Sequence, residues 1–240
     1  MGFIRFFSIL MISVSICSSS AHAEEDVMEY ELTPYIWGAG LSGDMGIRGR
    51  KFKVDKSFQE LFESFDGGGA FAFEARGNKF GFLGSITYAR TKDSESFRGV
   101  NVDVISESTI GEAALTYRVQ GPGLFQIYAG LRTFKVKAEI DSNVDLLDLE
   151  ESKSWVDPIV GLRMRFALNQ ALSLVLIGDI GGLGVSSDLV WNLIYGMRYD
   201  FNDRFFVTGG GRSMGVDYTD GGFTYDVTLS GFIVALGMKF

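Results

Sequence analysis

The chain ends in the stretch GFIVALGMKF, residues 231–240, in which an apolar side chain occupies every second position from Phe232 onward. Alternation with a period of two predicts a β-strand that has one apolar face. Chain ends usually fray unless the fold holds them. A strand that continues to the last residue therefore suggests that Phe240 acts as an assembly signal.

The opposite end of the chain has the features of a secretory signal peptide. Arg5 precedes an apolar run over residues 6–17, and the sequence AHA at 21–23 matches the A-x-A pattern of a cleavage site. We therefore expect residues 1–23 to be removed and residues 24–240 to form one domain.

The segment that would be removed contains the only cysteine, Cys17, and the only histidine, His22. A lipoprotein anchor at Cys17 is the alternative, but Ile16 stands where such signals place a small residue. General acid–base and nucleophilic catalysis draw most often on histidine, so we expect no enzymatic activity. Asp157 and Asp179 could form a pair of catalytic carboxylates, but arginines predicted nearby would hold both ionised and paired.

Metal and cofactor binding have little support in the sequence. Without histidine and cysteine only oxygen ligands remain, and the acidic segment 141–151 lacks the Asp-x-Asp-x-Asp-Gly order of a calcium loop. The glycines at 181–184 follow a predicted strand but precede no helix, which argues against a dinucleotide site. The net charge of −8, without any basic run, argues against a nucleic-acid partner.

No segment of the mature chain approaches the roughly 18 consecutive apolar residues that a transmembrane helix needs. An exported chain with two-residue alternation can cross a membrane only as a closed β-barrel, which satisfies every backbone group between strands. One face is apolar and the other mixes charge with glycine in the segments 71–76, 80–88, 112–119, 125–132, 155–166, 172–179 and 191–199. The sequence therefore predicts an all-β fold, a closed antiparallel transmembrane β-barrel.

The predicted connections alternate in length. Short ones at 77–78, 120–123, 168–170 and 202–203 alternate with longer polar ones near 92–102, 139–153, 184–188 and 218–223. Short periplasmic turns and longer outer loops are typical of bacterial outer-membrane barrels. Outward aromatic residues next to the short turns would form a girdle at one membrane surface: Phe80, Tyr117, Phe125, Phe166, Tyr199, Phe205 and Phe240.

The first third of the chain leaves the strand number open. Residues 30–37 form one predicted strand, and 45–47 with 52–54 form a predicted hairpin. Counting that hairpin gives 12 strands, which we favour, and treating it as a loop gives 10.

Two further features stand out in predicted strands and loops. Ser57 and Glu60 match a capping box, which predicts one short helix near 58–65, either packed on the barrel rim or placed as a lid over the lumen. Pro34 and Pro158 fall inside predicted strands, where a missing N–H predicts a bulge.

Five longer motifs stand out along the chain: LTPYIWG at 32–38, FEARGNKFGF at 73–82, WVDPIVGLRMRF at 155–166, GDIGGLGVSSDLVWN at 178–192 and DYTDGGFTYDVTLSG at 217–231. Together they resemble a family of uncharacterised Gram-negative outer-membrane β-barrel proteins. The resemblance implies a barrel in the cell outer membrane, inserted by the barrel-assembly machinery through its terminal aromatic residue. It implies no activity and no catalytic residue.

The inward faces of the predicted strands carry a charged lumen network. Cross-strand pairing predicts Glu112 opposite Arg132 and Asn192 opposite Arg212. The network consists of Glu74, Arg76, Glu112, Arg118, Arg132, Asp157, Arg163, Arg165, Asp179, Asn192, Arg198 and Arg212. We expect these charges mainly to tie strands together and fill the lumen.

Two functions fit these observations. The first is a structural or surface-interaction barrel with a largely charge-filled lumen, and the alternative is a narrow, weakly anion-preferring pore for small solutes. Outer-membrane lipid is the expected environment. Arg90, Lys135 and Lys137 would lie on the outer surface near the rim, where they match lipopolysaccharide phosphates by charge.

Overall fold

The computed structural model describes residues 28–97, 100–119, 123–142 and 149–240. The expected signal peptide, with its alternative anchor at Cys17, lies outside the described residues. Within the described part of the chain, no helix is long and apolar enough to cross a membrane.

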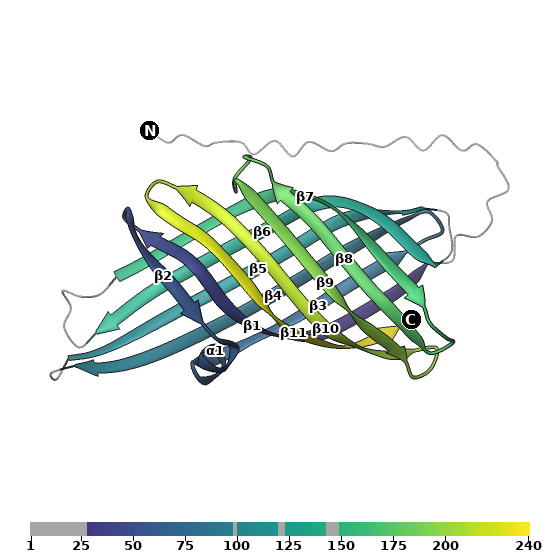
Figure 1. The fold of residues 1–240 in the computed structure, drawn as a ribbon, viewed down its shortest axis with the longest axis horizontal. Helices are drawn as coiled ribbons and strands as arrows, with labels where there is room; N and C mark the ends of the chain where they lie inside the picture. The colour runs from purple at the N-terminus through teal and green to yellow at the C-terminus, as the bar shows by residue number, and fades with distance from the viewer. Residues whose placement is uncertain (1–27, 98–99, 120–122, 143–148) are drawn as a thin grey trace, which may run out of the picture.

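The described strands form one antiparallel sheet that closes on itself (Figure 1). The sheet has 11 strands, and because β2 pairs with β1 alone, the other 10 form the barrel wall. The strands are β1 (Glu29–Ile47), β2 (Arg50–Lys56), β3 (Phe65–Arg76), β4 (Phe80–Phe97), β5 (Val100–Val119), β6 (Leu124–Ser142), β7 (Leu149–Ala167), β8 (Leu172–Gly182), β9 (Leu189–Asp200), β10 (Phe205–Asp220) and β11 (Phe223–Lys239).

The prediction of 12 strands is wrong, and the alternative of 10 is correct. Residues 30–37 and 45–47 belong to one continuous strand, β1, whose first part pairs with β3 and whose last part pairs with β2. The glycines between them allow close approach of neighbouring strands. A Cβ at Gly40 would stand 2.9 Å from the carbonyl oxygen of Lys56, and a Cβ at Gly43 would stand 2.2 Å from that of Asp226.

The predicted short helix is confirmed as α1 (Phe58–Glu63), with Ser57 and Glu60 forming the capping box. The helix is not a lid over the lumen. Phe58 packs edge-on against Phe232, 4.9 Å between ring centroids, and Phe232 belongs to the apolar outer face of β11. Phe62 is 65% exposed, so α1 presents an apolar surface outside the barrel wall, beside β1 (Figure 1).

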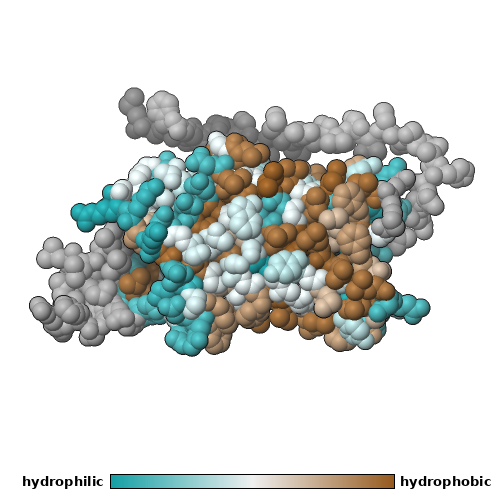
Figure 2. All heavy atoms as spheres, in the orientation of Figure 1, coloured by the Kyte–Doolittle hydropathy of each residue, from teal (hydrophilic) through white to brown (hydrophobic). Residues whose placement is uncertain are grey.

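The alternating apolar side chains of the strands point outward. Phe80 and Leu115 are 69% and 71% exposed, although both are large and apolar. Apolar residues spread over the middle of the outer surface, and hydrophilic residues gather towards its two ends (Figure 2). Such an apolar band is what a barrel wall needs where it meets lipid.

The last residue completes the closing seam between β1 and β11. Tyr30 and Phe240 exchange two backbone hydrogen bonds of 3.1 and 3.0 Å, and their rings stack at 5.8 Å. Phe80 and Tyr117 face each other at the same end of the barrel, where the short turns lie, with ring centroids 5.4 Å apart. We call this end, which holds Glu29 and Phe240, the terminal end and the other the distal end.

The two prolines cause no bulge. Pro34 lies opposite Phe71 and Pro158 opposite Leu131, both in unbroken register. The pairing of β1 with β11 omits Pro34, and the pairing of β7 with β8 begins only at Ile159. The missing N–H is therefore accommodated by a local gap in one ladder.

Three of the four distal connections are shorter than the sequence predicts, because the strands continue into the segments expected to be loops. The fourth, between β8 and β9, spans 183–188, in agreement with the predicted 184–188. β4 extends to Phe97, β6 extends to Ser142, and β10 and β11 are joined by Gly221 and Gly222, which have φ angles of +57° and +86°. Polar alternating residues can continue a hairpin beyond the membrane, since pairing does not require an apolar face.

Replacing Gly231 with alanine should weaken the β1–β11 seam. The added Cβ would stand 1.9 Å from the carbonyl oxygen of Gly38, so the backbone must shift, at a cost of about 1–3 kcal/mol. In electrophoresis without boiling, the folded barrel should migrate differently from the boiled chain. Gly231→Ala should lose this folded band at a lower temperature than wild type.

Gly209→Ala is the matched control, because a Cβ at Gly209 on β10 would meet no atom within 4 Å. Equal melting of the two variants would contradict the assigned seam packing.

Candidate functional site

The lumen contains three groups of buried side chains, stacked from the terminal to the distal end. We call them the terminal network, the middle network and the distal cluster. The first two are built from charged and polar residues and the third mainly from apolar residues. Their members come from strands far apart in the sequence, so each group ties the barrel wall together across the lumen.

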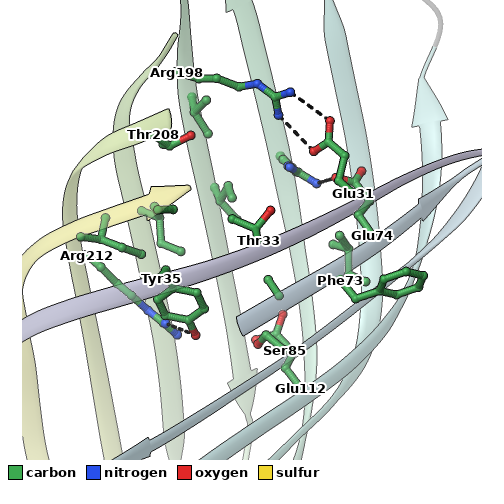
Figure 3. Close-up of a pocket in the computed structure, with 18 of the residues that line it drawn as sticks. Glu31, Thr33, Tyr35, Phe73, Glu74, Ser85, Glu112, Arg198, Thr208 and Arg212 are labelled. Atoms are coloured by element: carbon green, nitrogen blue, oxygen red, sulfur yellow. Dashed lines mark hydrogen bonds and ion pairs between the residues drawn. The ribbon is translucent and has the colours of Figure 1, made fainter. Parts of the chain in front are cut away.

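The terminal network connects four strands through carboxylates. Arg198 on β9 donates two hydrogen bonds of 3.0 Å to Glu31 on β1 (Figure 3). Arg76 lies 3.0 Å from Glu31 and 3.1 Å from Glu74, and Arg163 on β7 donates to Glu74. Three arginines thus share the two carboxylates of Glu31 and Glu74.

Two further contacts hold Arg198 in place. Its guanidinium lies 3.4 Å from the ring centroid of Phe206, and it pairs at 3.0 Å with Asp200. Asp200 also pairs with Lys239 at 2.7 Å, which extends the network to the last strand. The sequence interpretation missed Glu31 and Asp200. Glu31 has the same parity as Tyr35 on the inward face of β1, and that signal could have found it.

The middle network surrounds Arg132, which has no exposed surface. Glu112 lies opposite Arg132 in the register and accepts a hydrogen bond of 2.7 Å from it. Arg132 also donates bonds of 2.7 and 2.9 Å to Asp179. Tyr128 and Asn192 donate to the same carboxylate at 2.8 and 2.9 Å.

Arg212 extends the middle network across the lumen. It donates to Asn192 at 3.1 Å and to the hydroxyl of Tyr35 at 3.3 Å, and its guanidinium lies 4.3 Å from the ring of Trp37. The predicted register is wrong here, because Arg212 lies opposite Ile194 and not Asn192. The long arginine side chain still reaches Asn192 diagonally.

The distal cluster fills the lumen beyond the middle network. Trp155 stacks on Tyr218 with 4.1 Å between centroids and an interplanar angle of 4°. All its members are at most 7% exposed: Ile110, Phe134, Val136, Trp155, Val190, Met214, Val216, Tyr218, Phe223, Tyr225 and Val227. Side chains of this size leave the distal lumen occupied by close-packed apolar groups.

The connection between β8 and β9 folds onto this cluster. Ser187 is completely buried, and Asp157 accepts hydrogen bonds from its backbone N–H at 2.8 Å and from its hydroxyl at 2.6 Å. The Ser187 hydroxyl oxygen also accepts from Trp155 Nε1 at 3.0 Å. Asp157 therefore anchors a loop, whereas the sequence predicted that it pairs with arginines. Its register partner Arg132 donates elsewhere.

Open space remains near the terminal end. One cavity of about 180 Å³ lies between the terminal and middle networks, where Glu31, Arg165 and Arg212 share its lining with apolar residues such as Ile177 and Ile194 (Figure 3). A second, of about 410 Å³, lies at the terminal end and is lined by Glu29, Arg76, Arg118, Gly123, Leu124, Arg165, Ala167, Asn169, Gln170, Ser173, Asp200 and Lys239. We call this second cavity the terminal mouth.

The three cations of the predicted lipopolysaccharide contact lie on the outer side of β4 and β6. The register places Arg90 and Lys137 on either side of Glu107. Arg90 pairs with Asp66 at 3.0 Å, and Lys137 pairs with Glu139 at 3.0 Å. Acidic residues therefore share this surface, and Lys135 is the exposed member of the three.

The terminal and middle networks hold their charged side chains in fixed positions. Most carboxylate oxygens in these networks already accept hydrogen bonds from arginine, tyrosine or asparagine side chains. No group of three or more His, Cys, Asp or Glu residues in the described part of the chain is placed to hold a metal ion.

Comparison with known proteins finds likeness only among solved structures: no family model and no curated protein matches this chain. The outer membrane protease OmpT from Escherichia coli has 8% identity and a TM-score of 0.49, covering 92% of this chain and 98% of its own. The translocator domain of the autotransporter NalP from Neisseria meningitidis has 12% identity and a TM-score of 0.44, covering 91% and 90%.

The attachment invasion locus protein Ail of Yersinia pestis has 13% identity and a TM-score of 0.41, covering 89% of this chain and 99% of its own. At these identities and TM-scores, no activity, ligand or partner carries over to this chain.

Arg132→Met should destabilise the barrel strongly, because it leaves Glu112 and Asp179 in the lumen without their cation. Removing one partner of a buried pair costs about 3–5 kcal/mol. Lys56→Met is the control: Lys56 is 46% exposed and lies 4.0 Å from Asp93, and such surface pairs contribute at most about 1 kcal/mol. Denaturant unfolding in lipid vesicles, followed by tryptophan fluorescence, measures both. Equal shifts in the two variants would show that the middle network does not stabilise the fold.

Proposed function

We propose that the protein is an integral outer-membrane β-barrel of structural or surface-interaction type, whose lumen is closed to solutes. The closed ring of strands and the apolar outer surface support a membrane location. The signal peptide expected at residues 1–23 supports export. In single-chain bacterial barrels the short turns face the periplasm, so the terminal end would face the periplasm and the distal end the cell exterior.

The distal cluster is the observation that carries this proposal. Trp155, Tyr218 and Phe223 occupy the lumen at the end that would face the exterior, and Asp157 holds the β8–β9 loop against them. Opening this end would expose a large apolar surface to water, which is unfavourable at roughly 25 cal/mol per Å². The middle network adds a second barrier, because Arg132 is fixed between two carboxylates.

A narrow, weakly anion-preferring pore is the second candidate. The cavity between the networks and the terminal mouth both border Arg165, so the terminal half of the lumen has open space. Arginine outnumbers carboxylate among the predicted lumen residues, and the local lining of a pore sets its selectivity.

We also propose that the barrel is not an enzyme. Asp179 already accepts bonds from Arg132, Tyr128 and Asn192, and Asp157 accepts two from Ser187. A general acid or base must exchange protons with a substrate, and the oxygens of these two carboxylates already accept hydrogen bonds from side-chain and backbone donors of the barrel.

Purified wild-type protein in a planar lipid bilayer should carry little or no current, because the distal cluster blocks the lumen. Any small current should favour anions, given the surplus of arginine. Recovery of the heat-sensitive folded band from the same preparation shows that silent protein is folded protein. A large cation-selective current would contradict two proposals: that the lumen is closed, and that its arginine-rich lining favours anions.

Lipopolysaccharide is the partner we propose for the outer surface, with Arg90, Lys135 and Lys137 contacting its phosphates. Replacing all three with glutamine should lower the amount of lipopolysaccharide that co-purifies with the barrel. The effect should be modest, since acidic neighbours already pair with Arg90 and Lys137. Arg48→Gln with Arg50→Gln, at the distal β1–β2 turn, is the control. Unchanged co-purification would exclude this contact.

A further inference from the structure

The terminal mouth contains cationic groups that form no ion pair with the carboxylates of the described residues. Four basic residues line it, and two of them have carboxylate partners. Arg76 is surrounded by Glu29, Glu31 and Glu74, and Lys239 pairs with Asp200. Arg118 and Arg165 form neither an ion pair nor a side-chain hydrogen bond with any residue that the structure describes. Both face a cavity of about 410 Å³.

Two polar atoms on β5 and β6 have no hydrogen-bond partner among the described residues. Nε of Arg118 is buried without an acceptor, and Oε1 of Gln126, which is 1% exposed, is buried without a donor. These two residues lie opposite each other on β5 and β6, yet they do not satisfy each other. Buried polar atoms are nearly always paired, so the unpaired Nε–H of Arg118, which lines the mouth, indicates an acceptor there. The oxygen of Gln126 needs a donor instead, and Gln126 is not among the residues that line the mouth.

The strand register brings the two free arginines to the same side of the mouth. Arg118 lies opposite Gln126, and Arg165 lies opposite Leu124, which is two residues earlier in β6. Arg118 and Arg165 therefore project from β5 and β7, on either side of one strand. Side chains of this length can direct their guanidinium groups to a common point in the mouth.

An oxyanion matches this arrangement better than a carboxylate side chain or a neutral solute. Two guanidinium groups offer forked N–H donors that suit the oxygens of a phosphate group. The barrel has already used the nearby carboxylates on Arg76 and Lys239. Water alone would hydrate these donors but would not supply the negative charge that the guanidinium groups attract.

We propose that the terminal mouth is a binding site for a phosphate group, held by Arg118 and Arg165. The phosphate is either a free ion or the headgroup of a phospholipid next to the barrel rim. The site does not depend on whether the lumen conducts, since both arginines lie on the terminal side of the middle network.

Isothermal titration calorimetry on the full barrel in nanodiscs of neutral lipid tests this proposal at constant ionic strength. Inorganic phosphate represents the free ion, and glycerophosphoglycerol represents a lipid headgroup. Wild type should show saturable binding of at least one of them, and the tighter ligand identifies the source. Arg118→Gln with Arg165→Gln should weaken binding at least about tenfold, because charge-assisted hydrogen bonds are lost.

Arg48→Gln with Arg50→Gln removes the same charge at the distal end and should leave the affinity unchanged. The heat-sensitive folded band verifies that each variant is assembled. The proposal is overturned if wild type binds neither ligand saturably, or if the Arg118 and Arg165 double variant binds as tightly as wild type. It is also overturned if the distal control weakens binding equally, since general charge attraction would then explain the signal.

Discussion

The rest of the structure depends on closure of the sheet between β1 and β11. In a bilayer, a strand edge has no water to satisfy its N–H and C=O groups, so an open sheet would leave a row of unpaired backbone. The chain meets this constraint along almost the full length of β1, from Glu31 to Gly46. The two backbone bonds between Tyr30 and Phe240 complete the pairing at the terminal end. An aromatic last residue is thus part of the barrel wall.

Once the ring is closed, the strands direct half of their side chains into a narrow lumen, where a charge needs a partner. The two charged networks satisfy this need by joining residues that are remote in sequence, such as Glu31 and Arg198. The distal cluster meets the same demand for filled space with aromatic rings. Arg118 and Arg165 at the terminal mouth depart from this pattern, and that departure supports a ligand site there.

Side-chain parity was predictable from the sequence because a strand alternates its faces whatever its neighbours are. The outward positions of Phe80 and Leu115 and the inward positions of Arg132 and Asp179 follow from this local rule. The helix α1 was predictable for a similar reason, since its capping box lies within four residues. The same parity applies to Glu31, which shares the inward face of β1 with Tyr35, so its position in the lumen follows from the same local rule.

The sequence by itself determined the fold class and which side chains face the lumen, since both depend on a two-residue period. The tertiary structure decided the strand number, the partner of Arg212, the anchoring role of Asp157 and the place of α1 outside the wall. Glycines at 38–43 are compatible with a turn or with close strand packing, and only contact with β2 and β11 selects the second. Pairing across the lumen likewise depends on how far neighbouring strands are staggered, and that offset is a property of the closed ring as a whole.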